Sequence, residues 1–302
     1  HEPTPQAYIA ALLECTAEWA RVLKPGGSIF VNLGDKYANR TRGAWRGSSD
    51  GYTWRADSPR YVRPKDFPEK SLLLLPERYR IGAVDELGLI ARAVIIWDKP
   101  NGLPESVTDR VRRSHEDWVH LTKSPRYYSA VDEIREPASG YSRRPGARRA
   151  TPPGQRRRHM ADTVNPLGAL PGSVWDVPTE PLRVPEHLGV DHFAAFPTAW
   201  PRRIILGWSP PGICVECGEG RRPVADRSVH GADPARRIPG TGRDPYSRHG
   251  QPDAGSTLRG KHIRSITGYV CACPEASAPT RPAVVLDPFG GTGTTALVAS
   301  VL

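Results

Sequence analysis

The segment Ala283-Val-Val-Leu-Asp-Pro-Phe-Gly-Gly-Thr-Gly-Thr-Thr-Ala-Leu-Val-Ala-Ser300 has the most specific pattern in the chain. Its apolar start, residues 283–286, predicts a strand, and the apolar stretch after the glycines predicts a helix. Three glycines in the turn can adopt backbone angles closed to other residues and let a ligand approach the main chain: Gly290, Gly291 and Gly293. The first N–H groups of such a helix have no intrahelical acceptor. The pattern predicts a nucleotide-cofactor loop, and the glycines alone would fit an ordinary strand-turn-helix equally well.

Upstream of this segment, helical and strand patterns alternate. Apolar residues at helical spacing predict a helix over Tyr8–Leu23, and the β-rich run Ser28–Leu33 predicts a strand. The same order follows with a helix from Pro76 to Leu87 and a strand over Ile90–Trp97. A third strand is predicted over Arg126–Val131. This alternation predicts an α/β fold with a mostly parallel sheet and helices on both faces.

Length and charge limit the class of protein. A chain of 302 residues suits one large α/β domain with insertions. The segments 38–68, 136–172 and 219–266 are rich in Pro, Gly, Ser and Arg without periodicity, and we predict loops or partly disordered insertions there. The formal charge of +10 favours a polyanionic partner. Neither a membrane span nor a signal peptide is visible, so we expect a cytoplasmic protein.

The excess positive charge is concentrated in one stretch. Between Glu136 and Asp162 the sequence has no acidic residue and seven arginines, namely Arg143, Arg144, Arg148, Arg149, Arg156, Arg157 and Arg158. They are interleaved with Gly, Pro and Gln and follow no helical pattern. A solvated loop without function would explain the run, and a loop that tracks nucleic-acid phosphates would explain it as well.

Four of the five cysteines form two close pairs. Cys214-Val-Glu-Cys217-Gly and Cys271-Ala-Cys273 could complete a tetrahedral Zn²⁺ site, because a Cys-x-x-Cys-Gly turn directs both sulfurs inward. The long separation between the pairs leaves unliganded or redox-active cysteines as an alternative. Cys15 falls on the apolar side of the first predicted helix and is predicted to be a small core residue.

The glycine segment also carries a family resemblance. Asp287-Pro-Phe-x-Gly-x-Gly-Thr-Thr resembles the S-adenosylmethionine loop of the DNA amino-methyltransferases, which modify adenine N6 or cytosine N4, and it differs from the dinucleotide pattern G-x-G-x-x-G. Six further segments resemble this family and follow the order of its permuted, beta-type members, with the cofactor loop last: 23–35, 75–79, 95–101, 113–128, 173–177 and 191–205.

The resemblance implies a Rossmann-like S-adenosylmethionine-dependent methyltransferase sheet with circularly permuted motif order and with basic and zinc-knuckle insertions. It implies cofactor contacts from Asp287, Pro288, Phe289, Gly291, Gly293, Thr294, His192, Phe193 and Phe196. Double-stranded DNA would contact the seven arginines together with Lys99 and Arg113. Trp97, Asn101, His115 and Glu116 are further candidates for the DNA side, with His115 and Glu116 as a structural pair in the alternative.

The implied organisation has five parts. A catalytic-side half covers 1–135, a basic target-recognition loop 136–172 and a cofactor-side element 173–208. The cysteine-pair insertion covers 209–280, and the S-adenosylmethionine-binding strand, loop and helix cover 281–302.

One element of the family is absent from the 302 residues. The catalytic tetrapeptide, Asp/Asn/Ser-Pro-Pro-Tyr/Phe/Trp, holds the target amine and stacks its ring on the flipped base. Ser209-Pro-Pro-Gly212 has no ring and Asp244-Pro-Tyr246 lacks a proline, so both predict ordinary turns. No catalytic residue is therefore assigned. We expect a fragment truncated at both ends that alone would be unstable and inactive.

The expected activity of the intact protein is transfer of a methyl group from S-adenosylmethionine to an exocyclic amine of a DNA base. Cytosine N4 is favoured slightly over adenine N6, since the segment from Lys24-Pro-Gly-Gly27 to Asn32-Leu-Gly-Asp35 and the cysteine insertion resemble cytosine-N4 methylases of phages and restriction systems. The alternatives are a non-catalytic zinc-ribbon DNA-binding protein and a nicotinamide oxidoreductase with a Rossmann fold.

Overall fold

The computed structural model of the chain describes residue 2 and residues 4–38, 67–102, 104–136, 167–180, 196–230, 261–271, 273 and 278–302. The chain divides into two compact units. The first unit comprises His1–Ser129, Gly172–Ser209 and Val284–Leu302, and the second comprises Ala130–Pro171 and Pro210–Ala283. In the described part of the chain, no helix has both the length and the apolarity to cross a membrane.

The first helix and strand follow the sequence pattern. Helix α1 spans Pro5–Val22 and begins at Thr4, whose side chain accepts a hydrogen bond from the Ala7 N–H at 3.1 Å. A turn at Lys24-Pro-Gly-Gly27 separates it from strand β1, Ser28–Leu33. Alternate residues of β1 are buried, as a strand covered on one face requires. Cys15 is exposed, so its prediction as a core residue is wrong: the buried face of α1 runs through Leu12, Leu13 and Thr16 instead.

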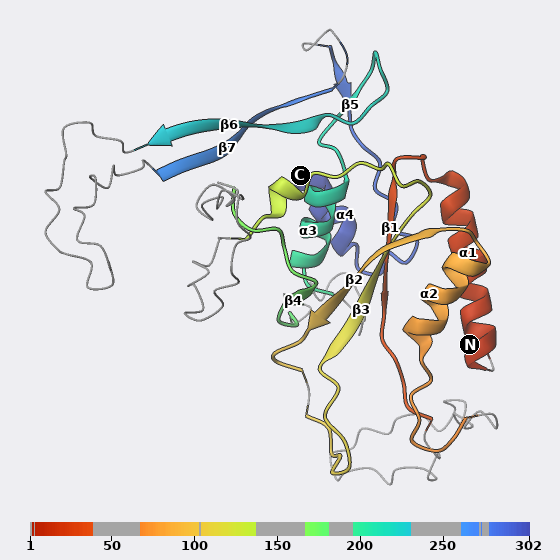
Figure 1. The fold of residues 1–302 in the computed structure, drawn as a ribbon. Helices are drawn as coiled ribbons and strands as arrows, with labels where there is room; N and C mark the ends of the chain where they lie inside the picture. The colour runs from red at the N-terminus through yellow and green to blue at the C-terminus, as the bar shows by residue number, and fades with distance from the viewer. Residues whose placement is uncertain are drawn as a thin grey trace, which may run out of the picture. The chain divides into compact units, whose positions relative to one another are not determined.

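The sheet of the first unit is mixed. Its order is β1-β3-β2-β4, with β2 at Ile90–Asp98, β3 at His115–Thr122 and β4 at Val174–Asp176 (Figure 1). β3 lies antiparallel to both β1 and β2, and only β2 and β4 pair in parallel. The predicted α/β class is confirmed. The expectation of a mostly parallel sheet is wrong, because β3 lies between β1 and β2 and runs antiparallel to both of them.

The third strand lies upstream of its predicted position. Residues 126–131 form no strand, since the chain turns at Ser124, whose side chain accepts the Arg126 N–H at 3.1 Å. β3 escaped the sequence pattern because polar side chains are buried within it. Asp117, His120 and Thr122 expose at most 8% of their surface. Buried polar groups of this kind require hydrogen-bonding partners from elsewhere in the fold.

Helices cover both faces of this sheet. On one face α1 packs beside α2, Leu75–Asp85 (Figure 1), over a core that includes Ile9, Leu13, Ile29, Val31, Tyr79, Val119 and Leu121. On the other face α3, Ala199–Trp208, places the fully buried Trp200 against Trp118 and Trp175, with ring centroids 4.9 Å apart in each pair. Aromatic pairs at this separation add to the gain from burial.

A polar contact joins the two helices of the first face. The hydroxyl groups of Thr16 and Tyr79 are 2.9 Å apart, and both residues are fully buried. Thr16 donates to the Leu12 carbonyl at 2.7 Å, which leaves the Tyr79 hydroxyl to donate to Thr16. Burial raises the pKa of Tyr79 to about 12. The Tyr79 hydroxyl therefore keeps its proton near neutral pH, and its bond to Thr16 fixes the register of α1 against α2.

Helix α2 takes its N-terminal cap from a distant residue. Leu74, which precedes the helix, has a left-handed backbone with φ 58° and offers no side-chain cap. The Asp35 carboxylate, just beyond β1, accepts the N–H groups of Leu74 and Leu75 at 3.1 Å each. A carboxylate at a helix N-terminus satisfies free donors and interacts favourably with the helix dipole. Asp35 thereby attaches the end of β1 to the start of α2.

The final segment differs from its prediction at one point. Helix α4 forms at Thr294–Val301, as expected, and packs with α3 (Figure 1). Residues 283–286 form no strand, and Val284 and Leu286 are 84% and 63% exposed. A strand forms only where the backbone of a neighbouring strand supplies ladder hydrogen bonds. Among the described residues, no strand pairs with the backbone of residues 283–286.

The second unit contains short and long strand pairs. β5, Ile213–Cys214, pairs with β8, Thr280–Arg281, and β6, Arg222–His230, pairs with β7, Lys261–Val270. A short 3₁₀ helix lies at Val131–Ile134. The prediction of loops throughout 219–266 is therefore wrong for the strand residues. Charged residues within β6 and β7 obscure the strand pattern, and the strands are defined by pairing with each other.

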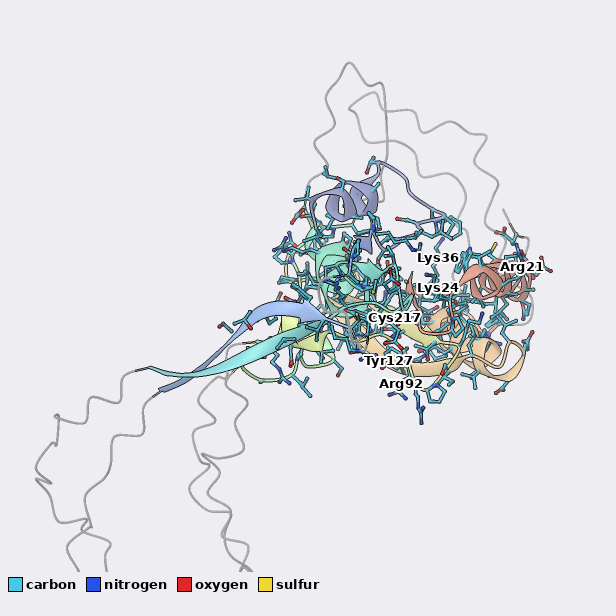
Figure 2. All side chains as sticks on the ribbon, turned by 90° about the horizontal axis from the view of Figure 1, so that it is seen from above. Arg21, Lys24, Lys36, Arg92, Tyr127 and Cys217 are labelled. Carbon is cyan, nitrogen blue, oxygen red and sulfur yellow. The ribbon has the colours of Figure 1, made fainter. Side chains whose placement is uncertain are left out.

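His120 is a neutral histidine inside the first unit. Its ring stacks on Phe30 with centroids 4.3 Å apart, and its Nε2 lies 3.0 Å from the Ser28 hydroxyl. Arg92 lies nearby, where it hydrogen-bonds the Tyr127 hydroxyl at 3.3 Å (Figure 2). Burial, reinforced by the positive charge of Arg92, lowers the pKa of His120 to about 4. The imidazole thus serves the core, where its protonation is disfavoured.

This depressed pKa predicts acid sensitivity. Between about pH 6.5 and pH 4 the unfolded state binds a proton that folded His120 does not, so stability is full above pH 6.5 and falls with pH through this window. At about 1.4 kcal/mol per pKa unit, this group accounts for roughly 2 kcal/mol of lost stability at pH 5. Urea denaturation at pH 7 and pH 5 measures the loss. A His120→Phe variant should show a smaller loss between these pH values, and an equal loss would contradict the assignment.

Candidate functional site

The glycine loop before α4 is braced by one carboxylate. Asp287 Oδ1 accepts the Phe289 N–H at 3.1 Å, and Oδ2 accepts the Thr295 hydroxyl at 2.6 Å. The Gly293 N–H donates to the Gly290 carbonyl at 2.7 Å. These bonds connect the start of the loop to the first turn of α4. They therefore brace the Asp-Pro-Phe segment against the start of the helix.

Two glycines in this loop have left-handed backbones. Gly291 has φ 52° and Gly293 has φ 80°, a region that strongly favours glycine. A Cβ atom at Gly293 would have no other atom within 4 Å. Gly293 is therefore needed for its conformation, and the space above it is open to a ligand. α4 has no side-chain cap, so its first N–H groups are suited to a bound polar group.

The loop also carries an exposed aromatic side chain, Phe289. Phe289 is 68% exposed, and its ring meets Trp19 of α1 edge-on at 5.7 Å between centroids. Exposed aromatic surface beside a glycine turn suits a flat ring of a ligand. Phe196, also predicted at the cofactor, has its described ring contact with Trp118 at 5.8 Å, in the aromatic layer on the α3 face.

Lys99 and Arg113, predicted to contact DNA, both have partners within the protein. Lys99 forms an ion pair with Glu116 and lies 4.1 Å from the Trp97 ring centroid. Arg113 donates to the backbone carbonyl of Asp35. Glu116 pairs with Lys99, so the expected alternative of a His115–Glu116 pair is not what the structure shows.

These residues meet at one edge of the sheet. β1 and β2 end there and β3 begins there, so Asp35, Lys99 and Glu116 gather from separate parts of the sequence. Ligand sites of α/β proteins often lie at the carboxyl ends of parallel strands. Lys99 and Glu116 expose only 20% and 24% of their side chains. Because the two opposite charges largely cancel, the main role of the pair is to join the end of β2 to the start of β3.

The four paired cysteines converge in the second unit. The sulfur atoms of Cys214, Cys217, Cys271 and Cys273 all lie within 4.8 Å of one another. Cys214 is buried, and Cys217, which is labelled in Figure 2, is exposed. Hydrogen bonds from the backbone N–H groups of Cys217 and Glu216 lower the pKa of the Cys214 thiol to about 7.

Several predicted residues lie outside the described part of the chain. These are His192 and Phe193 of the cofactor set and all seven arginines of the basic run, Arg143, Arg144, Arg148, Arg149, Arg156, Arg157 and Arg158. Asp244-Pro-Tyr246 also lies outside it. Ser209 follows the last turn of α3 and donates its N–H to the Ile205 carbonyl at 2.8 Å, and residues 209–212 form bends and irregular backbone beyond the helix.

Three residues at these sites were not assigned a role from the sequence. Thr295 braces the loop, Trp19 packs against Phe289, and Asp35 joins β1 to α2. Thr295 had a local signal, because a hydroxyl in the first turn of a helix can reach back to an aspartate in the preceding loop. The contacts of Trp19 and Asp35 are long-range and have no local sequence signal.

Comparison with known proteins gives related sequences. The Type II methyltransferase M.SmaI of Serratia marcescens is 35% identical over 205 residues, which are 68% of this chain and 60% of the relative. The Type II methyltransferase M.Cfr9I of Citrobacter freundii is 33% identical over 68% of this chain and 57% of the relative. This chain therefore spans about 60% of the length of these relatives.

A solved structure titled as the Pvu II DNA methyltransferase, cytosine-N4-specific, aligns with a TM-score of 0.43. It is 16% identical and is matched over 68% of this chain and 56% of that chain. The sequence model of a family described as DNA methylase, N6_N4_Mtase, matches residues 2–215. Because this match covers well over half of the 302 residues, the chain belongs to the N6/N4 DNA methylase family.

Proposed function

We propose that the protein containing this chain is a site-specific DNA methyltransferase that transfers a methyl group from S-adenosylmethionine to an exocyclic amine of a base in double-stranded DNA. The observation that carries the proposal is the braced glycine loop before α4, in a chain of the DNA methylase family. A Type II restriction-modification setting fits the named relatives.

The loop residues fit the cofactor. Gly291 and Gly293 bring the main chain close to the open space beside the loop, and the N-terminus of α4 offers N–H donors to polar groups. The exposed Phe289 ring offers a flat apolar surface to the adenine. Pro288 and Thr294 flank these residues in the loop, and His192, Phe193 and Phe196 stay assigned as further contacts on the resemblance.

Asp287 positions the loop in this scheme. Both of its oxygens accept hydrogen bonds from the loop itself, one from Phe289 and one from Thr295. A carboxylate used in this way fixes the directions of the neighbouring N–H groups before binding, which lowers the entropy lost when the ligand is ordered. S-adenosylmethionine supplies an electrophilic methyl group on its sulfonium when it is bound.

The basic segment supplies the attraction to DNA. Lys99 is paired to Glu116 and Arg113 is bonded to the Asp35 backbone, and the seven arginines between residues 143 and 158 carry most of the excess charge of this chain. Arginine contacts to phosphates provide affinity and orientation without selecting a sequence. We assign target approach to this segment. Cytosine N4 is proposed over adenine N6 on the resemblance of the segment from Lys24 to Asp35 and of the cysteine insertion.

A substitution at Gly293 tests the cofactor loop. Gly293→Ala places a Cβ on a residue with φ 80°, which costs about 1–2 kcal/mol in the left-handed region. It also fills part of the open space. We expect binding of S-adenosylhomocysteine, measured by calorimetry on the whole protein, to weaken at least about tenfold. Gly172→Ala is the control, since a Cβ at Gly172 would also have no atom within 4 Å and this residue belongs to no glycine loop. Equal affinities in both variants, or tight binding of NAD by the wild type, would overturn the assignment.

The reaction itself has a direct product test. The whole protein, incubated with duplex DNA and S-adenosylmethionine, should yield N4-methylcytosine on nucleoside mass spectrometry. N6-methyladenine in its place would retain the enzyme class and reverse the base assignment. DNA binding with neither product would support the non-catalytic alternative.

Salt dependence tests the basic segment. Replacing Arg156, Arg157 and Arg158 together by Gln should reduce the slope of log affinity against log salt by about three, because each phosphate contact contributes about 0.9. Nonspecific duplex DNA is the probe, and fluorescence anisotropy across a salt series is the measurement. Arg21→Gln is the matched control, since Arg21 is an exposed arginine that pairs with Glu18 on α1. An unchanged slope in the triple variant would contradict the role.

A further inference from the structure

We propose that Cys214, Cys217, Cys271 and Cys273 bind one Zn²⁺ ion in a closed structural site at the base of the β6–β7 hairpin. The site is separate from the proposed methyl-transfer chemistry and rests on the geometry of the second unit alone. Its ligands would be four thiolates, two from residues 214–217 and two from residues 271–273, at the two ends of the segment that contains β6 and β7.

The four sulfur atoms are already close to their metal-bound arrangement. All of them lie within 4.8 Å of one another. A tetrahedral zinc site with Zn–S bonds of about 2.3 Å places its sulfur atoms about 3.8 Å apart. A contraction of roughly 1 Å, within reach of side-chain torsions, therefore completes the tetrahedron.

The first pair sits in a turn that directs both sulfurs to one side. The Gly218 N–H donates to the Cys214 carbonyl at 3.0 Å, and Gly218 has φ 70°, which a residue with a side chain rarely adopts. The Cys214 N–H donates to the Glu219 carbonyl at 2.9 Å. These backbone bonds close the turn that carries Cys214 and Cys217.

Strand pairing delivers the second pair to the same place. Arg222, just after the turn, is paired with Val270, so β7 ends beside the start of β6. Cys271 follows β7 directly, and Cys273 lies two residues beyond. β8 then returns to pair with β5, with Thr280 opposite Cys214. The metal would link the ends of β5 and β7, where the strand ladders begin and end.

The hairpin needs support of this kind. Three of its described apolar side chains are exposed: Val224, Tyr269 and Val270 expose 38%, 37% and 44% of their surface. A two-stranded hairpin without a buried face is marginally stable in water. Few buried apolar residues are described in this unit, among them Ile134, Ile213 and Ala278. Small units with little core commonly depend on disulfides or metals.

The ligand chemistry selects zinc and a structural role. Soft thiolate ligands in a tetrahedral set suit Zn²⁺ and disfavour Mg²⁺ and Ca²⁺, which prefer oxygen. Four protein ligands fill the coordination sphere and leave no position for water or substrate. The ion would therefore hold the hairpin and take no part in catalysis.

Metal content of matched variants provides the test. Purified whole protein should retain close to one zinc per chain by elemental analysis. Cys217→Ser should lose most of it, whereas Cys15→Ser should retain it, and both residues are exposed cysteines. Equal zinc in the two variants, a wild type without zinc, or iron in place of zinc would overturn the proposal. An intact mass showing disulfides among these cysteines in wild type would overturn it as well.

A second measurement covers the case in which Cys217→Ser fails to fold. All eight tryptophans lie within 1–129 and 172–209, so their fluorescence reports the first unit only. Removing zinc from wild type with a chelator should increase hydrogen exchange across β6 and β7 and leave tryptophan emission unchanged. Unchanged exchange in the hairpin after complete zinc loss would overturn the structural role.

Discussion

The antiparallel pairing of β3 with both β1 and β2 is the interaction on which the first unit depends. In the described sheet, β3 is the strand that pairs with β1, and it is one of the two strands that pair with β2. The two faces of β3 also pack against two different layers. Val119 and Leu121 belong to the core under α1 and α2, while Trp118 and His120 contact the aromatic layer on the α3 side. A defect in this strand would disturb both layers at once.

β3 also shapes the edge of the sheet where Asp35, Lys99 and Glu116 meet. Glu116 near the start of β3 pairs with Lys99 after β2, and Arg113 reaches the backbone at Asp35 after β1. Asp35 in turn fixes the start of α2. Lys99 and Arg113, which were expected to contact DNA, thus bond to other residues of the protein and stabilise this edge of the sheet. The proposed attraction to DNA therefore depends on the arginine segment, which has no acidic residue between Glu136 and Asp162.

Local patterns predicted what local physics determines. The helix and strand around Lys24-Pro-Gly-Gly27, the helix after Pro76, β2 and the helix after the glycines follow from periodicity and turn residues. β3 did not, because its polar residues are buried against long-range partners such as Ser28. The strand expected at 283–286 failed for the opposite reason, since an apolar, β-prone run needs a neighbour. At the candidate sites, the glycine positions and the convergence of the cysteines were predictable, whereas the partners of Asp35, Lys99 and Phe289 were set by tertiary packing.

The pairing of β5 with β8 makes the cysteine-bearing excursion modular. Cys214 and Thr280 are opposite each other in this pair, so the chain leaves and returns at points only about 5 Å apart. Residues 215–279 could therefore be lengthened, replaced or lost during evolution without moving the strands on either side. The family match, which ends at residue 215, stops where this excursion begins. A protein built in this way can acquire a new appendage while its sheet and glycine loop stay the same.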